Sequence, residues 1–255
     1  MKRFGLKVLY LLFPWTLILT VWYLIPLTGL VNEALVPLPH VVAKKFVVLM
    51  TVNDLWIDML VSCRRVLSGL ALGITAAVPA AFLLGWYKPA RRLVDPMINF
   101  FRSLPPIALI PLIIVYFGID ELAKTVMLFY AAFFASVIVM YEGIVQTNPV
   151  FIRVARTLGA SDFEIFWRVI VPLSVPHILT ALRVALGVSW ATLVASELVA
   201  AQRGLGAVIQ NASNYFQIDT VYVGIISIGA IAVFMDAILR MVTARAVRWQ
   251  DRMTS

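Results

Sequence analysis

The side chains that could do chemistry in this 255-residue chain are few and scattered. Cys63 is the only cysteine, so the chain can form no internal disulfide and offers no cysteine cluster for a metal. His40 and His177 are far apart in the sequence, which makes a metal site built on them a weak hypothesis. The sequence contains no Walker A motif, no GxSxG, no HExxH and no paired carboxylates in a catalytic arrangement. We therefore expect no catalytic centre, no bound cofactor and no metal site in this chain.

A second group of polar residues lies in or beside long apolar segments, where ionisable groups are costly and often functional. Asp236 stands four residues before Arg240, which predicts a simple i, i+4 ion pair. Glu197 either lines a translocation path or marks the end of a helix. The prolines near 105 either kink a helix that lines a path or mark a packing irregularity. The candidate path residues are Pro105, Pro106, Trp190, Thr192, Ser196 and Glu197.

The composition decides the class of protein. Hydrophobic residues make up 62% of the chain and charged residues only 13%, which is typical of an all-α polytopic membrane protein embedded in a lipid bilayer. A formal charge of +8 would suggest nucleic-acid binding in a soluble protein. Here it is better explained by basic loops on the cytoplasmic side of a membrane, with no nucleic-acid partner.

The apolar segments predict a single domain, 1–255, with six membrane-spanning helices. The first begins after Lys2 and Arg3, lacks a small-residue cleavage site, and is read as an uncleaved helix. Residues 35–51 are interpreted as a short helix at the membrane surface, and 54–65 as a polar approach to the second span. The second span carries Gly69 and Gly73, which favour close helix packing. The predicted spans are 8–25, 66–87, 97–117, 123–141, 173–198 and 221–239.

Six spans place both termini on one side, and the basic residues indicate which side. Thirteen lysines and arginines fall in the two termini, the turn at 88–92 and the loop 148–172. At most six fall in the other loops: Lys44, Lys45, Arg64, Arg65, Lys124 and Arg203. The positive-inside rule then predicts cytoplasmic termini and a cytoplasmic loop 148–172.

That loop, 148–172, predicts two short amphipathic helices outside the bilayer. Asn148 is a favoured N-cap residue, and Pro149 fits the first helical position. Gly159 ends the first helix by tolerating a left-handed conformation. Ser161 and Glu164 have the spacing of a capping box that starts the second, which we expect to end at Pro172. The apolar stripe of the first helix consists of Phe151, Val154, Ala155 and Leu158.

The same loop resembles the EAA loop of ABC importer permeases, because Gly159 is followed at the family's spacing by Val169-Ile170-Val171-Pro172. Arg153 replaces the motif's glutamate and Val154 its first alanine, so the glutamate contact is not carried over. The resemblance implies a coupling helix that docks in a groove of a cytoplasmic ATPase. It assigns coupling to Phe151, Arg153, Val154, Ala155, Leu158, Gly159, Ala160 and Pro172.

The resemblance extends to segments 102–119, 155–198 and 203–212, which look like the nitrate, sulfonate and taurine branch of these permeases; 191–206 is most similar to taurine members. It implies the type I (MetI-like) importer fold, a homodimer, two ATPase subunits that bind ATP and Mg²⁺, and a periplasmic substrate-binding protein. The implied solute is a small anion such as taurine or a related sulfonate. Nitrate, a thiamine precursor or an aromatic acid remain alternatives. A secondary transporter is disfavoured, since no convincing inverted repeat is visible.

Overall fold

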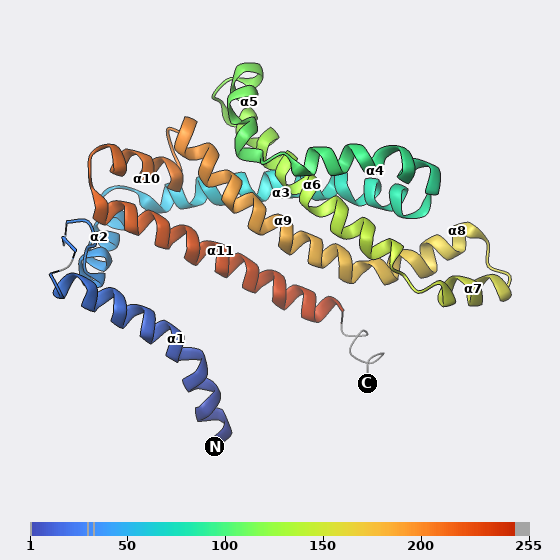
Figure 1. Cartoon of the computed structure of the whole chain (residues 1–255), viewed down its shortest axis with the longest axis horizontal. Coiled ribbons are helices and arrows are strands. Elements are labelled where there is room, and N and C mark those ends of the chain that lie inside the picture. The colour runs from blue at the N-terminus through green and yellow to red at the C-terminus, as the bar shows by residue number, and fades with distance from the viewer. Residues whose placement is uncertain (1, 30, 33, 248–255) are drawn as a thin grey trace.

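The computed structural model describes residues 2–29, 31, 32 and 34–247, and within these ranges all regular structure is helical, as predicted. The long helices lie side by side and give the molecule two ends (Figure 1). The helices are α1 Lys2–Leu27, α2 Pro39–Val52, α3 Leu55–Trp86, α4 Lys88–Ser103, the 3₁₀ turn η1 Pro106–Leu109, α5 Ile110–Phe117, α6 Glu121–Val145, α7 Pro149–Thr157, α8 Asp162–Ile165, the π-helical turn η2 Phe166–Ile170, α9 Val171–Ala200, α10 Leu205–Asn214 and α11 Ile218–Ala246.

Four of the described helical stretches are long and apolar enough to cross a membrane: Leu55–Trp86, Glu121–Val145, Asp162–Val199 and Ile218–Ala246. A fifth candidate is the pair Lys88–Ser103 and Pro106–Phe117, which meet at an angle of 84°. Within α1, Phe13–Leu27 is a shorter apolar stretch, and the apolar sequence before it continues back to Val8. The fold is therefore polytopic, with four to five candidate spans among the described residues.

Three predicted boundaries are wrong in detail. The stretch 54–65 is not a separate polar segment that leads into the second span. From Leu55 onward it is part of α3, one continuous helix whose polar side chains find buried partners. The third span, 97–117, starts too late: α4 begins at Lys88 and ends at Ser103, where Pro105 and Pro106 interrupt the apolar stretch as expected. The helix after Ser161 does not end at Pro172 but runs on through η2 into α9. A proline is tolerated there because it occupies the first turn of α9.

The core lies where α3, α6 and α9 pack against one another. Leu128 and Ala132 on α6 are fully buried, and an added Cβ at Gly69 would lie 2.3 Å from the Leu128 Cβ. At Gly73 an added Cβ would lie 2.6 Å from the Ala132 Cβ and 2.9 Å from the backbone nitrogen of Phe133. The predicted close approach of helices at these small residues is confirmed.

We expect Gly73→Ala to destabilise the protein by about 1–3 kcal/mol, because the neighbouring backbone of α6 must move to admit the methyl group. Gly229→Ala is the matched control: Gly229 lies inside α11 and an added Cβ there meets nothing within 4 Å. In a helix interior that substitution alone should stabilise by about 0.5–1 kcal/mol. Thermal unfolding in detergent should give shifts of opposite sign; equal shifts would contradict the packing described.

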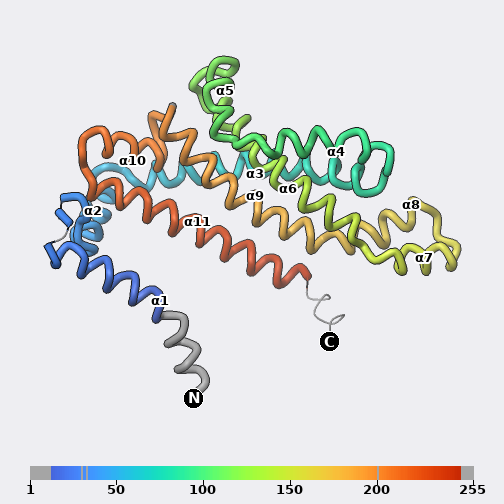
Figure 2. Tube along the Cα trace, viewed as in Figure 1, coloured from blue at the N-terminus to red at the C-terminus, as the bar shows by residue number. Residues whose placement is uncertain are grey.

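Helix α9 connects the two ends of the molecule (Figure 2). Its 30 residues give it a length of about 45 Å. The loop with α7 and α8 precedes it at one end, and α10 and α2 lie at the other. Each end carries a group of functional candidates, and one continuous helix joins them.

Candidate functional site

The two-helix loop has the local structure that its sequence predicts. The Asn148 side chain accepts a hydrogen bond from the Val150 backbone N–H at 3.0 Å and caps α7. Gly159 has φ +83°, so it occupies the left-handed region that favours glycine. Ser161 and Glu164 form the predicted capping box at the start of α8. An ion pair of 3.0 Å between Arg156 and Asp162 joins the two helices across the turn, a contact that the sequence analysis did not identify.

An apolar hollow of about 750 Å³ lies between α7 and the start of α9. We call its lining the docking surface. The outward side chains are well exposed: Phe151 is 46%, Val154 53% and Leu158 82% accessible. The docking surface consists of Val150, Phe151, Val154, Ala155, Leu158, Arg168, Val169, Pro172 and Leu173. Such exposure of large apolar side chains at one end of the molecule is typical of a surface that a partner protein covers.

Of the remaining coupling candidates, two face the body of the protein and one is exposed. Ala155 and Ala160 are half-buried and pack against the core cluster formed by α3, α6 and α9. Arg153 is exposed, and in the described part of the chain it forms no ion pair. The second helix is fixed to α3 by Phe166, whose ring lies edge-on to Phe82 and Trp86 at 5.4 and 5.8 Å. The body of the protein thus holds the loop in place while its apolar stripe stays outward.

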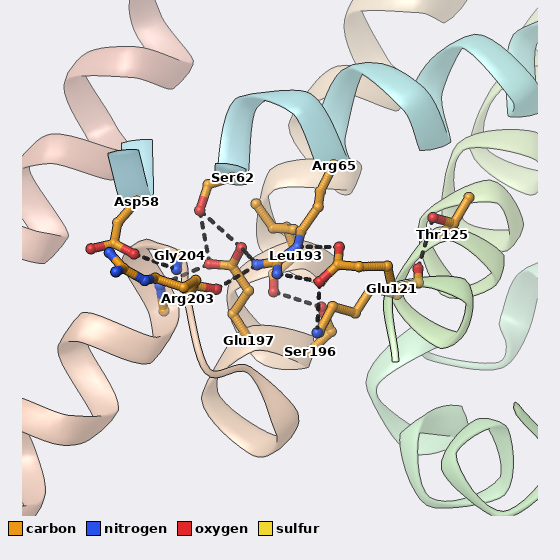
Figure 3. Close-up of polar contacts among 12 residues, drawn as sticks. Asp58, Ser62, Arg65, Glu121, Thr125, Leu193, Ser196, Glu197, Arg203 and Gly204 are labelled. Carbon is orange, nitrogen blue, oxygen red and sulfur yellow. Dashed lines mark hydrogen bonds and ion pairs between the residues drawn. The ribbon is translucent and has the colours of Figure 1, made fainter. Parts of the chain in front are cut away.

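A group of ion pairs, which we call the Arg65 cluster, lies where α3 meets the start of α6 and the end of α9 (Figure 3). The Arg65 Nη1 lies 2.7 Å from the Glu197 Oε1, and its Nε donates to the Glu121 Oε2 at 2.8 Å. The Ser62 hydroxyl donates to Glu197 at 2.8 Å, and the Arg203 carbonyl accepts a further bond from Arg65. Arg65 is 6% and Glu197 1% accessible. This cluster joins α3, α6 and α9 by charge-assisted hydrogen bonds.

The same side chains also hold the start of α10. The Gly204 N–H donates to Asp58 at 2.9 Å, and the Gly206 N–H donates to Glu197 at 2.8 Å. The Leu205 N–H donates to the Ser62 hydroxyl at 2.9 Å. The first N–H groups of a helix lack partners within the helix, so these three acceptors satisfy donors that would otherwise be buried unpaired. The approach is close enough that a Cβ at Gly206 would lie 2.5 Å from the Glu197 Cβ.

The structure places most of the candidate path residues inside the helix packing. Trp190, Thr192, Ser196 and Glu197 are all buried, and of these only Ser196 borders a hollow, of about 10 Å³, among those found in the described part of the chain. Of the two readings of Glu197, its partners favour a structural one. Pro105 is exposed at the bend after α4, and Pro106 is half-buried. Their part in a path stays a prediction.

The predicted pair on α11 is present, with the Arg240 Nε donating to Asp236 at 2.7 Å. Its second partner was missed: Arg183 on α9 donates to the other carboxylate oxygen at 2.9 Å. Arg65, Glu121 and Asp58 were missed in the same way. They are distant in sequence from the residues they contact, so no short spacing indicates them.

Comparisons with known proteins agree with this geometry. Residues 69–248 match the family "Binding-protein-dependent transport system inner membrane component". A probable ABC transporter permease of Brucella abortus (strain 2308) is 46% identical over 231 residues, 91% of each chain. The taurine transport system permease protein TauC of Escherichia coli (strain K12) is 34% identical over 91% of this chain and 86% of its own.

The fold is likewise similar to that of a solved importer. An inward-facing structure of the MetNI methionine ABC transporter contains a chain that superposes with a TM-score of 0.64 at 19% identity, covering 78% of this chain and 98% of its own. The four to five candidate spans, the exposed two-helix loop and the family match lead to the same conclusion. The chain belongs to the inner-membrane components of binding-protein-dependent transport systems, as a multi-pass permease subunit of an ABC importer that is not itself an enzyme.

Proposed function

We propose that this permease imports taurine or a related sulfonate. The observation that carries the substrate is similarity in sequence: besides the taurine permease, putative aliphatic sulfonates transport permeases of Escherichia coli and Bacillus subtilis are 32% and 29% identical over nearly the whole chain. The active assembly is a homodimer of this chain with two cytoplasmic ATPase subunits and a periplasmic binding protein. ATP and Mg²⁺ bind to the ATPase subunits.

The docking surface is the part of the chain that meets the ATPase. Its side chains from α7 and the residue after it lie outside the candidate spans Glu121–Val145 and Asp162–Val199, so lipid does not need them. An amphipathic helix that buries such a face in a groove of its partner gains about 1.5–3 kcal/mol of binding free energy per large apolar side chain. Because α9 runs without a break from the docking surface to Glu197, movement of the ATPase would shift α9 as a rigid body and displace the Arg65 cluster with it.

The proposed topology has six crossings, by α1, α3, the bent pair of α4 and α5, α6, α9 and α11, with both termini cytoplasmic. The asymmetry of thirteen basic residues against at most six supports it.

Cysteine labelling should verify this topology. In a variant whose Cys63 is replaced, single cysteines at positions 53 and 213 should react with a membrane-impermeant maleimide in intact cells, because both positions are exposed and lie on the outer side. A cysteine at 157 should react only after permeabilisation. Position 250, a further cytoplasmic site by sequence, lies outside the described residues. Reaction at 157 in intact cells would contradict the topology.

The function is tested by reconstituting the permease with its ATPase and binding protein in proteoliposomes. We expect uptake of labelled taurine that requires ATP inside and binding protein outside. An imposed ion gradient without ATP should drive none, which separates the importer from a secondary transporter. Excess unlabelled nitrate, thiamine precursor or aromatic acid should compete less well than an alkanesulfonate. ATP-dependent uptake of one of these instead would overturn the substrate and keep the importer.

A further inference from the structure

A hollow of about 440 Å³ lies where the end of α4 meets α6 and α9. Its α6 wall consists of Tyr130, Phe134, Ile138 and Glu142, which recur every four residues and therefore share one face of that helix. Val184 and Val188 form the α9 wall, and Arg102 and Pro106 close the α4 side. The hollow is thus largely apolar, with one basic group at one end and one acidic group at the other.

Arg102 is the unusual member of this lining. It lies in the last turn of α4, is exposed, and in the part of the chain that the structure describes it makes no hydrogen bond and no ion pair. Arg183 on α9, by contrast, is paired with Asp236 at 2.9 Å. A charged side chain within a spanning segment is costly unless it faces a partner or a water-filled cavity. The side chain of Arg102 borders a cavity, but among the described residues it has no hydrogen-bond or ion-pair partner.

The end of α4, which carries Arg102, has a fixed place beside α6. The Tyr130 hydroxyl donates a hydrogen bond to the backbone carbonyl of Phe101, which fixes the end of α4 beside α6. Tyr130 lies nine residues after Glu121, the first residue of α6, or about 14 Å along the helix. The end of α4 therefore lies beside the central part of α6, which is one of the candidate spans. Glu142 lies a further twelve residues along α6, about 18 Å from Tyr130, and within the described residues no ion pair joins it to Arg102.

We propose that this hollow is a binding site on the transport path for a small organic oxyanion, whose anionic group Arg102 holds. The proposal rests on the proposed function and adds the site. A guanidinium presents a planar fork of donors that matches sulfonate or carboxylate oxygens. The apolar side chains of Phe134, Val184 and Val188 offer contacts to a short hydrocarbon chain beside it. A bare inorganic anion would use the arginine but leave the apolar wall without contacts.

A structural role for Arg102 makes a different prediction. A basic residue in the last turn of a helix interacts favourably with the helix dipole, and lysine does so as well as arginine. Lysine cannot replace the bidentate fork. Arg102→Lys therefore separates a dipole partner from an anion ligand. Arg92→Gln is the matched control, because Arg92 is an exposed arginine on the same helix that does not line the hollow.

The test uses the intact permease–ATPase complex without binding protein, with taurine and ethanesulfonate as probes in titration calorimetry. Wild type and Arg92→Gln should bind with the same affinity. Arg102→Gln and Arg102→Lys should each weaken binding by about tenfold or more, as expected for hydrogen bonds to a charged group. Thermal midpoints and co-purification with the ATPase should not change. In proteoliposomes the same variants should lose uptake while keeping ATP hydrolysis.

The outcomes separate the site from the substrate. If the complex binds ethanesulfonate through Arg102 but does not import taurine, the site stands and the proposed substrate is refuted. Uptake of taurine by wild type with no sulfonate binding in the complex, or full binding by Arg102→Lys, would overturn the site and keep the importer.

Discussion

Replacing Leu158 with aspartate should reduce assembly of the permease with its ATPase by about a hundredfold or more and remove uptake. Leu158 is 82% accessible at the tip of α7, within the docking surface. Burial of a leucine is worth about 1.5–3 kcal/mol, and an aspartate in its place adds the desolvation of an unpaired carboxylate. Each 1.4 kcal/mol, roughly, is a factor of ten in the association constant. Co-purification and uptake in proteoliposomes measure the two effects.

Thr157→Asp is the control, since it introduces the same charge at the preceding position. Thr157 is exposed but does not line the hollow, so its variant should assemble normally. Arg153→Ala should also be tolerated, because Arg153 is exposed and unpaired within the described chain. Normal assembly of Leu158→Asp would mean that this loop is only a surface loop, and the coupling role would be wrong.

Gly159→Val should separate assembly from coupling. An added Cβ at Gly159 meets nothing within 4 Å, so the cost is backbone strain at φ +83° and not a clash. A valine there favours another conformation, and α8 then leaves α7 at a different angle. We expect partial assembly with ATP hydrolysis that drives less uptake. A wild-type ratio of uptake to hydrolysis would contradict a fixed angle between the two helices.

The parts of the fold that the sequence predicted correctly are those encoded within a few residues. Asn148, Gly159 and the Ser161–Glu164 pair each act on backbone groups no more than four positions away. Helix packing at Gly69 and Gly73 was predictable for a related reason, because small residues repeated on one helix face leave room for a neighbour.

The parts that could not be predicted depend on contacts between distant residues. Arg65 and Glu197 are 132 positions apart. Hydropathy alone assigned 54–65 to the outside because it scores a charge without regard to its partners. The prolines indicated that the third apolar stretch is interrupted, but they did not predict the angle of 84° between its two parts.

Glu197→Ala should be among the most damaging single substitutions in this chain. Removing one member of a buried ion pair leaves the other charge unpaired and costs about 3–5 kcal/mol. Here the change would leave Arg65 with Glu121 as its remaining carboxylate in the described chain, and deprive the Ser62 hydroxyl and the Gly206 N–H of their acceptor. Because Glu197 is only 1% accessible, we expect an effect comparable to loss of the docking surface.

Two variants distinguish how Glu197 acts. Glu197→Gln keeps an acceptor for Ser62 and Gly206 but loses the charge, so its thermal midpoint should lie between wild type and Glu197→Ala. Asp162→Ala breaks the exposed pair with Arg156 and should cost less than about 1 kcal/mol. If Glu197→Ala lost uptake with an unchanged thermal midpoint, Glu197 would act on the solute and not on the fold. If neither changed, the Arg65 cluster would not be holding α10 to α3 and α9, and this end of the permease would be organised by apolar packing alone.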